Sequence, residues 1–253
     1  MSDNRIVLVT GSSRGIGEAL VRGFAQKGCG VIINCRTSTD EAEALMGDMI
    51  AKGEVLPEKV MIAPCDIASR DEVVRMFDAV EAHFGTPPDI LINNAGLNID
   101  RPFLELTQQE WQRVCDINLT GTFNVSQEFA KRYKGKNGHI VSISAATAIH
   151  GRANGANYCA SKAGVVTLDK CMAIELAPNI SVNTVHPGYI NTREVIERYE
   201  LEKPDKLRSL LDKIPQNRLG RVEDVFGTID FIVSGASFVT GQNFFVNGGN
   251  YMH

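Results

Sequence analysis

A chain of 253 residues can form one large α/β domain or two small ones. Hydrophobic residues make up 43% and charged residues 22%, which is a normal balance for a globular protein. The net charge of −4 argues against a general nucleic-acid binder, because such proteins usually carry a basic stripe.

The cysteines and apolar runs set further limits. None of the six scattered cysteines forms a C-x-x-C pair, so neither a zinc site nor a disulfide framework is indicated. Reduced thiols in a cytoplasmic protein fit this usage. Met1–Arg5 leads straight into an apolar strand without a signal-peptide core, and no apolar run approaches the ~20 residues of a membrane span. We therefore expect a cytoplasmic protein with no bound metal and no membrane or nucleic-acid partner.

Strands and helices are predicted to alternate along the first half of the chain. Ile6–Val9 is a continuous apolar run, typical of a parallel strand buried on both faces. After a glycine-rich turn, apolar residues recur at helical spacing from Ile16 to Ala25. The other elements predicted in this half are strands at 31–33, 60–63 and 90–92, and helices at 39–52 and from about 73 to Gly85.

The second half continues this alternation with one exception. Helices are predicted at 107–116, 119–134, 156–176 and 222–234, and strands at 140–143, 180–185 and 244–246. The segment 189–217 differs, because it is polar, charged and weakly periodic and contains Pro204 and Pro215. We expect it to form a mobile lid that selects the substrate, since it lies beyond a strand end.

This alternation predicts a single α/β domain over 1–253, a doubly wound parallel sheet of the Rossmann type. Ligands of such sheets bind beyond the carboxyl ends of the strands. Motifs stand at five of these ends, and they are Thr10–Gly17, Asp66, Asn93–Gly96, Ser144 and Pro187-Gly188. We expect all five to converge on one cleft.

Two of the strand ends point to a dinucleotide. Thr10–Gly17 has the spacing G-x-x-x-G-x-G between a strand and a helix, which lets backbone N–H groups approach a pyrophosphate. An acidic residue after the second strand would bind the ribose 2′-hydroxyl of NAD, but the chain has Asn34-Cys35-Arg36-Thr37-Ser38 there. Arg36, with Arg14 and the hydroxyls of Thr37 and Ser38, could instead bind a 2′-phosphate, although both arginines could also be solvated. The segment favours NADP(H).

Tyr158 and Lys162 are one helical turn apart in the predicted helix 156–176. A free phenol titrates near pH ~10, and a neighbouring ammonium lowers its pKa. The pair therefore predicts a general acid. The same spacing also occurs by chance on exposed helix faces, so its weight comes from the motifs around it.

Together these motifs resemble the short-chain dehydrogenase/reductase family over essentially the full length. The matching segments are Thr10–Gly17, Cys65-Asp66-Ile67, Asn93–Gly96, Asn118, Tyr158 with Lys162, and Pro187-Gly188 with Thr192. The resemblance implies that Tyr158 protonates a carbonyl oxygen while a nicotinamide delivers hydride. It implies that Lys162 lowers the pKa of Tyr158 and holds the nicotinamide ribose, and that Asn118 anchors a water that relays protons.

The resemblance also implies which residues line the cofactor. They are Gly11, Ser13, Arg14, Gly15, Ile16, Gly17, Arg36, Thr37, Asp66, Ile67, Asn93, Ala95, Gly96, Tyr158, Lys162, Pro187, Gly188, Ile190 and Thr192. Among them, Asp66 is expected at the adenine, and Ile190 and Thr192 at the nicotinamide carboxamide.

One position departs from the family pattern. The family's serine, which hydrogen-bonds the substrate carbonyl, usually lies 13 residues before the tyrosine, where this chain has Ala145. The neighbouring Ser144 is our candidate for that role, and the alternative is a strand-end hydroxyl that bonds a backbone group. Other candidate donors are Thr147, His150 and Asn154.

Within the family, the pattern is most similar to 3-oxoacyl-acyl-carrier-protein reductases. Leu219–Asp224 and the ending Val246–Gly249 carry this similarity, although Asn247 replaces an expected Asp. We therefore expect NADPH-dependent reduction of a ketone, namely a 3-oxoacyl thioester of acyl carrier protein or CoA, in fatty-acid or polyketide-type biosynthesis. The alternatives are an NAD(P)-dependent sugar or small-alcohol dehydrogenase and a catalytically weak NADP-binding scaffold.

Three groups of residues could contact partners, and each could instead have an ordinary structural role. One group could contact an acidic carrier protein or form a solvated helix end, and it comprises Lys131, Arg132, Lys134 and Lys136. Another could contact an acidic or phosphopantetheine-bearing substrate or be solvated, and it comprises Arg193, Arg198, Tyr199 and Lys203. By resemblance we expect a homotetramer, or a homodimer, built on helices 119–134 and 156–176 and the last strand. Four apolar residues could lie in the subunit interface or in the core of one chain, and they are Phe123, Val165, Val166 and Leu168.

Overall fold

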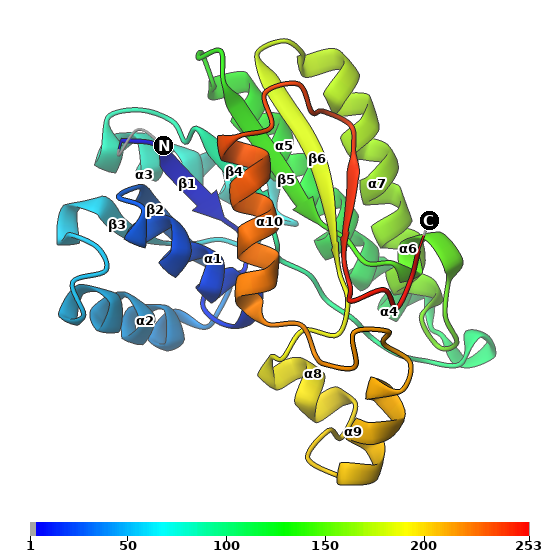
Figure 1. The fold of residues 1–253 in the computed structure, drawn as a ribbon. Helices are drawn as coiled ribbons and strands as arrows, with labels where there is room; N and C mark the ends of the chain where they lie inside the picture. The colour runs from blue at the N-terminus through cyan, green and yellow to red at the C-terminus, as the bar shows by residue number, and fades with distance from the viewer. Residues whose placement is uncertain (1–3, 253) are drawn as a thin grey trace.

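The computed structural model describes residues 4–252, and its seven strands form one parallel sheet (Figure 1). The strands are β1 Ile6–Val9, β2 Gly30–Cys35, β3 Val60–Pro64, β4 Ile90–Asn93, β5 Gly138–Ile143, β6 Ile180–Pro187 and β7 Asn243–Val246. Their order is β3-β2-β1-β4-β5-β6-β7. It reverses between β1 and β4, which is where ligands bind in such sheets. The predicted doubly wound parallel sheet is confirmed.

Helices cover both faces of the sheet. One face carries α1 Gly15–Gln26, α2 Thr39–Ala51 and α10 Val222–Ser234, and the other carries α3 Arg70–Phe84, α5 Gly121–Arg132 and α7 Ala156–Leu176. The shorter helices are η1 Pro57–Lys59, η2 Phe103–Glu105, α4 Gln108–Cys115, the π-helix η3 Asp116–Thr120, α6 Thr147–His150, α8 Arg193–Arg198 and α9 Pro204–Leu211.

The central strands are apolar on both sides because each side meets a helical layer. In β1, Val7 and Val9 pack with the α1 and α10 layer, while Ile6 and Leu8 pack with the α3 and α5 layer. All four side chains are at most 5% exposed. Burying one such side chain contributes about 1.5–3 kcal/mol, so this short strand stabilises two layers at once.

The predicted elements agree with the observed ones to within a few residues, and α7 and α10 have the predicted bounds. The expected helix 119–134 differs at its start, where the π-helix η3 precedes α5. Single π-helical turns inside helices are frequent at functional sites. Helix α6 escapes prediction because a single turn is too short to show a periodic pattern.

The segment 189–217 projects beyond the carboxyl edge of the sheet as α8 and α9 (Figure 1). Three of its apolar side chains are buried, since Leu201, Leu210 and Ile214 are between 4% and 6% exposed. Its weak periodicity follows from its short helices of six and eight residues.

Candidate active site

The glycine-rich turn between β1 and α1 is held in shape by neighbouring strands. Gly11 and Gly15 have φ angles of +62° and +63°, which glycine adopts without strain. Asn34, in β2, accepts a hydrogen bond from the Gly11 amide at 3.1 Å. Asn94, just beyond β4, donates to the carbonyl oxygens of Thr10 and Gly11, both at 2.9 Å. Asn94 was absent from the expected site residues, yet it fixes the turn.

The turn leaves space on one side only. A Cβ at Gly11 would lie 2.8 Å from the Ala95 Cα, and one at Gly17 would lie 2.6 Å from the Gly11 carbonyl oxygen. At Gly15 a Cβ would meet only the Thr192 Cγ2, at 3.9 Å. Helix α1 begins there without a side-chain cap, so its first N–H groups can bind an anion. The start of α1 at Gly15 therefore offers free backbone N–H groups that could bind an anion such as a pyrophosphate.

Two exposed arginines lie at the expected adenosine end. The Arg36 guanidinium is 3.7 Å from the Asp66 carboxylate, and the Arg14 guanidinium is 3.4 Å from Glu41. The two arginine side chains are 47% and 76% exposed. Exposed ion pairs of this kind contribute about 0–1 kcal/mol, so either arginine can exchange its partner for a phosphate.

Polar side chains next to these arginines have separate tasks. The hydroxyls of Ser13 and Ser38 are 3.0 Å apart, and Thr37 is exposed beside them. Asn34 points inward instead and donates to the Ala63 carbonyl at 2.9 Å. The end of β2 therefore offers hydroxyls and a cation to a ligand, but no carboxylate of its own.

Several other expected cofactor residues act through the backbone or brace the sheet. Ile67 is 5% exposed, so only its main chain can reach a ligand. Asn93 is buried and donates to the hydroxyls of Ser126 and Ser142, at 2.8 and 3.3 Å. The Ala95 amide is occupied by the Thr10 hydroxyl at 3.0 Å.

The chain after β6 forms the opposite wall. A Cβ at Gly188 would lie 2.7 Å from the Asn247 Cα, so the strand end passes close to the end of β7. Ile16 and Pro187 are half-buried, and Ile190 is 1% exposed within the core. The Thr192 hydroxyl caps α8, accepting from the Val195 amide at 3.4 Å.

Tyr158, Lys162 and Asn118 meet at the carboxyl edge of β4 and β5. The Lys162 Nζ donates to the Ile143 carbonyl at 2.7 Å and lies 6.0 Å from the centroid of the Tyr158 ring. A Cβ at Gly96 would lie 3.5 Å from both the Lys162 Nζ and the Asn118 Oδ1. Lys162 and Asn118 therefore flank Gly96, with Tyr158 beside them.

Burial controls the titration of this pair. Burial, with a smaller contribution from Glu194, raises the pKa of Tyr158 to about 12, while Arg152 and Arg198 act to lower it. Burial also lowers the pKa of Lys162 to about 8, although Asp169 and Glu194 act to raise it. In this structure the loss of solvation outweighs the cations nearby, so the pKa of Tyr158 lies above its ordinary value, and a lowering of this pKa by Lys162 stays a prediction.

Asn118 joins two segments next to Tyr158. It is fully buried in η3, and its Oδ1 accepts from the Leu97 amide at 2.7 Å. Its Nδ2 donates to the Leu97 carbonyl and to the Ser161 hydroxyl, both at 2.9 Å. Ser161 in turn donates to the Tyr158 carbonyl at 2.8 Å. Asn118 thus ties the chain after β4 to α7, and its role in a water relay stays a prediction.

Comparison with known proteins agrees with this geometry. Residues 5–203 match the family described as short chain dehydrogenase. A 3-oxoacyl-[acyl-carrier-protein] reductase of Staphylococcus epidermidis is 37% identical, over 98% of this chain and 100% of that protein. The nodulation protein G of Azospirillum brasilense is 36% identical, over 98% of each chain.

The chain belongs to the short-chain dehydrogenase/reductase family. A solved short-chain dehydrogenase/reductase of Brucella melitensis, of the glucose/ribitol dehydrogenase type, superposes with a TM-score of 0.86 at 28% identity. The match covers 98% of this chain and 97% of that one. The protein is therefore an oxidoreductase of the CH–OH/C=O class, and its family uses NAD(P)(H).

The two serines near the family's serine position both make hydrogen bonds inside the protein. Ser144 is 3% exposed, and its hydroxyl donates to the Lys162 carbonyl at 3.1 Å. Ser142 is fully buried and donates to Asp169 at 2.9 Å. Both hydroxyls are thus engaged inside the protein, as in the alternative interpretation of Ser144. Ala145, half-buried at the family's serine position, has no side-chain donor.

The other candidate donors are less well placed or unpaired. His150 is exposed, with its ring 5.0 Å from that of Tyr251, and Asn154 is exposed with a φ of +59°. The Thr147 hydroxyl is buried and has no hydrogen-bond partner among the described residues. Thr147 therefore stays a candidate.

A buried acid lies behind Lys162, and sequence reasoning missed it. Asp169 is 1% exposed and accepts from the hydroxyls of Ser142 and Thr184, at 2.9 and 2.7 Å. Burial raises its pKa to about 7, while the two hydroxyls and Lys162 act to lower it. Its position eleven residues after Tyr158 puts it on the same helix, but only the strand positions of Ser142 and Thr184 reveal its burial.

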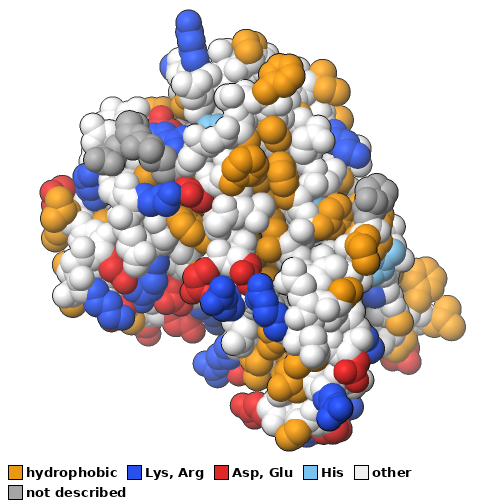
Figure 2. All heavy atoms as spheres, in the orientation of Figure 1, with side chains coloured by type: hydrophobic (Ala, Val, Ile, Leu, Met, Phe, Trp, Pro, Cys, Tyr) orange, Lys and Arg blue, Asp and Glu red, His pale blue; other side chains and the backbone are white. Residues whose placement is uncertain are grey.

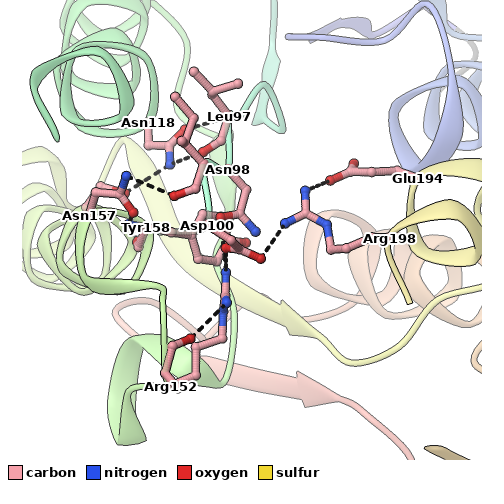
Figure 3. A network of polar contacts seen from close by, with 12 residues as sticks. Leu97, Asn98, Asp100, Asn118, Arg152, Asn157, Tyr158, Glu194 and Arg198 are labelled. Atoms are coloured by element: carbon pink, nitrogen blue, oxygen red, sulfur yellow. Dashed lines mark hydrogen bonds and ion pairs between the residues drawn. The ribbon is translucent and has the colours of Figure 1, made fainter. Parts of the chain in front are cut away.

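Charged side chains gather at the mouth of the site (Figure 3). Asp100, beyond β4, pairs with Arg152, before α7, and lies 3.5 Å from Arg198 of α8. Arg198 also pairs with Glu194 at 2.7 Å. Arg152 and Asp100 were not among the expected site residues, because they lie far apart in the sequence and share no motif.

Some expected partner-binding residues are wrongly placed for the cleft. Arg132 ends α5, which runs to the amino edge of the sheet near Gly138, whereas the site lies at the carboxyl edge. Arg132 is also paired with Asp78 and Glu128, both at 2.7 Å. The basic group formed by residues 131–136 is therefore a helix end away from the cleft.

The remaining surface residues have simple placements. Arg193 and Lys203 are exposed and pair within the segment 189–217 with Glu197 and Glu200. On the face shown in Figure 2, acidic and basic side chains are intermingled. Of the residues expected at an interface, Phe123 is 42% exposed, Leu168 is half-buried, and Val165 and Val166 belong to the core of this chain.

Residues 4–252 contain neither a membrane-spanning helix nor a cluster of metal-ligating side chains. No helix in this range is long and apolar enough to cross a membrane. No group of three His, Cys, Asp or Glu side chains in the same range could hold a metal ion. The six cysteines, all within it, are free thiols.

Proposed function

We propose that this enzyme reduces a ketone to an alcohol with NADPH, and that the ketone is a 3-oxoacyl thioester of acyl carrier protein or CoA. The observation that carries the proposal is the meeting of Tyr158, Lys162 and Asn118 beside Gly96. The substrate class is supported by full-length similarity to proteins of Staphylococcus and Synechocystis that are named 3-oxoacyl-[acyl-carrier-protein] reductase.

The residues would divide the work as follows. NADPH, when bound, supplies a hydride to the carbonyl carbon. Tyr158 donates its proton to the carbonyl oxygen, which would otherwise become an unstabilised alkoxide. Lys162, held by the Ile143 carbonyl, contributes its charge to stabilising the phenolate and binds the cofactor ribose. Asn118 keeps the backbone of Leu97 in place beside them.

Preference for NADPH over NADH is supported by Arg36 and Arg14, which are open to solvent next to Ser13 and Ser38. Arg36→Gln should weaken NADPH binding about 10- to 100-fold, because a charge-assisted hydrogen bond contributes about 1.5–3 kcal/mol. NADH binding should not change. Arg113→Gln, on the exposed face of α4, is the matched control. Equal loss for both cofactors would contradict the assignment.

The substrate class is tested by following NADPH oxidation with acetoacetyl-CoA, a small diketone and a keto sugar. We expect kcat/KM to be highest for the thioester. A higher value for the diketone or the keto sugar would refute the thioester assignment. NADPH binding without turnover of any of the three would favour the scaffold alternative, which Ala145 supports.

A second candidate function is an NAD(P)-dependent sugar or small-alcohol dehydrogenase. The solved relative of the glucose/ribitol dehydrogenase type and Asn247 at a position where Asp is expected favour it. Faster oxidation of ribitol or glucose with NAD than reduction of acetoacetyl-CoA with NADPH would establish this alternative.

We also propose that α8 and α9 cover the bound substrate and that the cytoplasmic protein is a homotetramer built on α5, α7 and β7. Exposed Phe123 on α5 and Ile174 on α7, at 42% and 80%, support the assembly. Light scattering should give four times the mass of one chain. A monomer in Phe123→Asp with an unchanged fold would identify the interface, and a wild-type monomer would refute the assembly.

A further inference from the structure

Arg152 stands directly against the catalytic tyrosine. Its Cζ lies 5.7 Å from the centroid of the Tyr158 ring, closer than the Lys162 Nζ at 6.0 Å. The side chain is only 22% exposed, so water screens its charge incompletely. A cation at this distance favours an ionised phenol.

Three contacts hold the guanidinium in this place. Its Nη2 donates to the Asn98 Oδ1 at 3.0 Å and to the Asp100 carboxylate, and its Nη1 donates to the Ala153 carbonyl at 3.3 Å. Figure 3 shows Arg152 reaching from the chain before α7 toward Asp100, with Tyr158 alongside. The guanidinium is thus held by the chain beyond β4 and by the chain just before α7.

Gly155 provides the room for this arrangement. A Cβ there would lie 2.8 Å from the Arg152 Cζ and 2.9 Å from its Nε. The φ of Gly155 is −119°, which any residue can adopt, so the constraint is the space taken by the arginine. The side chain of Arg152 therefore lies across the start of α7.

Charged groups face Tyr158 from every neighbouring segment. Arg198 and Glu194 come from α8, and Lys162 and the titratable Cys159 come from α7. Arg152 and its partner Asp100 come from the two loops. Arg152 and Arg198 oppose the effect of burial on the pKa of Tyr158, and Glu194 reinforces it. Of the two arginines, Arg152 has the larger effect and lies against the ring.

We propose that Arg152 tunes Tyr158 in this enzyme: its guanidinium, fixed by Asp100 and Asn98, stabilises the ionised phenol and compensates for the hydroxyl that Ala145 lacks. The inference rests on the proposed ketone reduction. There the phenolic proton leaves for the substrate oxygen, the O–H electron pair stays on Tyr158, and solvent later returns a proton. Arg152 keeps its own protons throughout, so it is a positioning residue rather than an acid.

The first test needs no turnover and no cofactor. All tyrosines are replaced by a ring-fluorinated tyrosine, whose more acidic phenol titrates while the protein is folded, and the Tyr158 fluorine resonance is assigned with Tyr158→Phe. Arg152→Met should raise the titration midpoint by about 1 pH unit or more. Arg152→Lys should keep most of the wild-type midpoint. An unchanged midpoint in Arg152→Met, or an equal rise in Arg152→Lys, would overturn the proposal.

A second variant displaces the charge without removing it. Gly155→Ala should push the guanidinium from the ring and raise the same midpoint, even if Arg152→Met folds poorly. Gly227→Ala in α10, where a Cβ meets nothing within 4 Å, is the control. A wild-type midpoint in Gly155→Ala would contradict the proposed positioning.

The pH dependence of reduction gives the functional test. Because Tyr158 must be protonated to act, kcat/KM falls as the pH rises through its pKa, and Arg152→Met should move that fall to higher pH. Ala145→Ser should increase kcat/KM by a larger factor in the Arg152→Met variant than in the wild-type enzyme. If no ketone is reduced, the proposed function fails while the fluorine titration still tests Arg152. If ketones are reduced but Arg152→Met shifts neither the pH at which kcat/KM falls nor the midpoint of the fluorine titration, only the proposed role of Arg152 is wrong.

Discussion

The two ends of the candidate site are built by different means. At the cofactor end, backbone shape dominates: Gly11 and Gly15 adopt positive φ angles, and Asn34 and Asn94 hold the turn through main-chain atoms. At the substrate end, side-chain charges dominate, with Asp100 joined to Arg152 and Arg198.

This difference explains why one end follows the family pattern and the other departs from it. A turn that must approach a pyrophosphate leaves little freedom for its glycines, because a Cβ at Gly11 or Gly17 would collide with the backbone. Ion pairs between surface segments can be rearranged by single substitutions. Ala145 therefore lies at the end of the candidate site where side-chain charges surround Tyr158.

The largest effect is expected where the two ends meet. Tyr158→Phe removes the proton donor and should reduce kcat by about 10²- to 10⁴-fold, the range typical of general acid catalysis. NADPH affinity should be retained, because the turn and its polar supports are untouched. Stopped-flow reduction and fluorescence titration of NADPH measure the two quantities.

Tyr133→Phe is the matched control, since Tyr133 lies at the end of α5 and its hydroxyl accepts from the Asn137 amide at 3.0 Å. It should leave kcat unchanged. Wild-type turnover in Tyr158→Phe would remove the tyrosine from the mechanism.

The cofactor end is tested by adding one methyl group. Gly11→Ala forces a Cβ to 2.8 Å from the Ala95 Cα at a φ of +62°. Such strain costs about 1–3 kcal/mol, so we expect a lower melting temperature and weaker NADPH binding together. Gly47→Ala in α2, with nothing within 4 Å of the added Cβ, should be neutral or stabilising. Unchanged NADPH affinity in Gly11→Ala would show that the turn is more adaptable than the comparison implies.

The same contrast decides how far the sequence could be interpreted. Buried strands, α7 and the Gly-rich turn follow from local pattern, because apolar runs and glycine spacing directly encode burial and backbone shape. The charge cluster at Asp100 and the burial of Asp169 depend on contacts between residues that are distant in sequence. Ser144 shows most clearly what the sequence could not predict. The sequence shows Ser144 next to Ala145, but not that the Ser144 hydroxyl donates to the Lys162 carbonyl.

Asp169, buried on α7, should make the free energy of unfolding depend on pH. Burial raises its pKa from 3.8 to about 7, so between these values the native state holds a proton that the unfolded state has released. Stability should therefore fall as the pH rises through this window, by on the order of 2–4 kcal/mol. Asp169→Asn should flatten this dependence in urea denaturation. Glu43→Gln, exposed on α2, should not. A wild-type slope in Asp169→Asn would assign the dependence to other groups.

The smallest effect is expected at Ser144, and it sharpens the comparison most. Its hydroxyl donates to the Lys162 carbonyl at 3.1 Å, so Ser144→Ala should lower the free energy of unfolding by about 1 kcal/mol and leave kcat/KM unchanged. Urea denaturation and steady-state kinetics on the same preparation separate the two results. A tenfold or greater loss of kcat/KM at wild-type stability would place the hydroxyl in the reaction after all. In that case Ser144 supplies the family's hydroxyl donor, one residue before the usual position. Arg152 would then have no missing hydroxyl to compensate for.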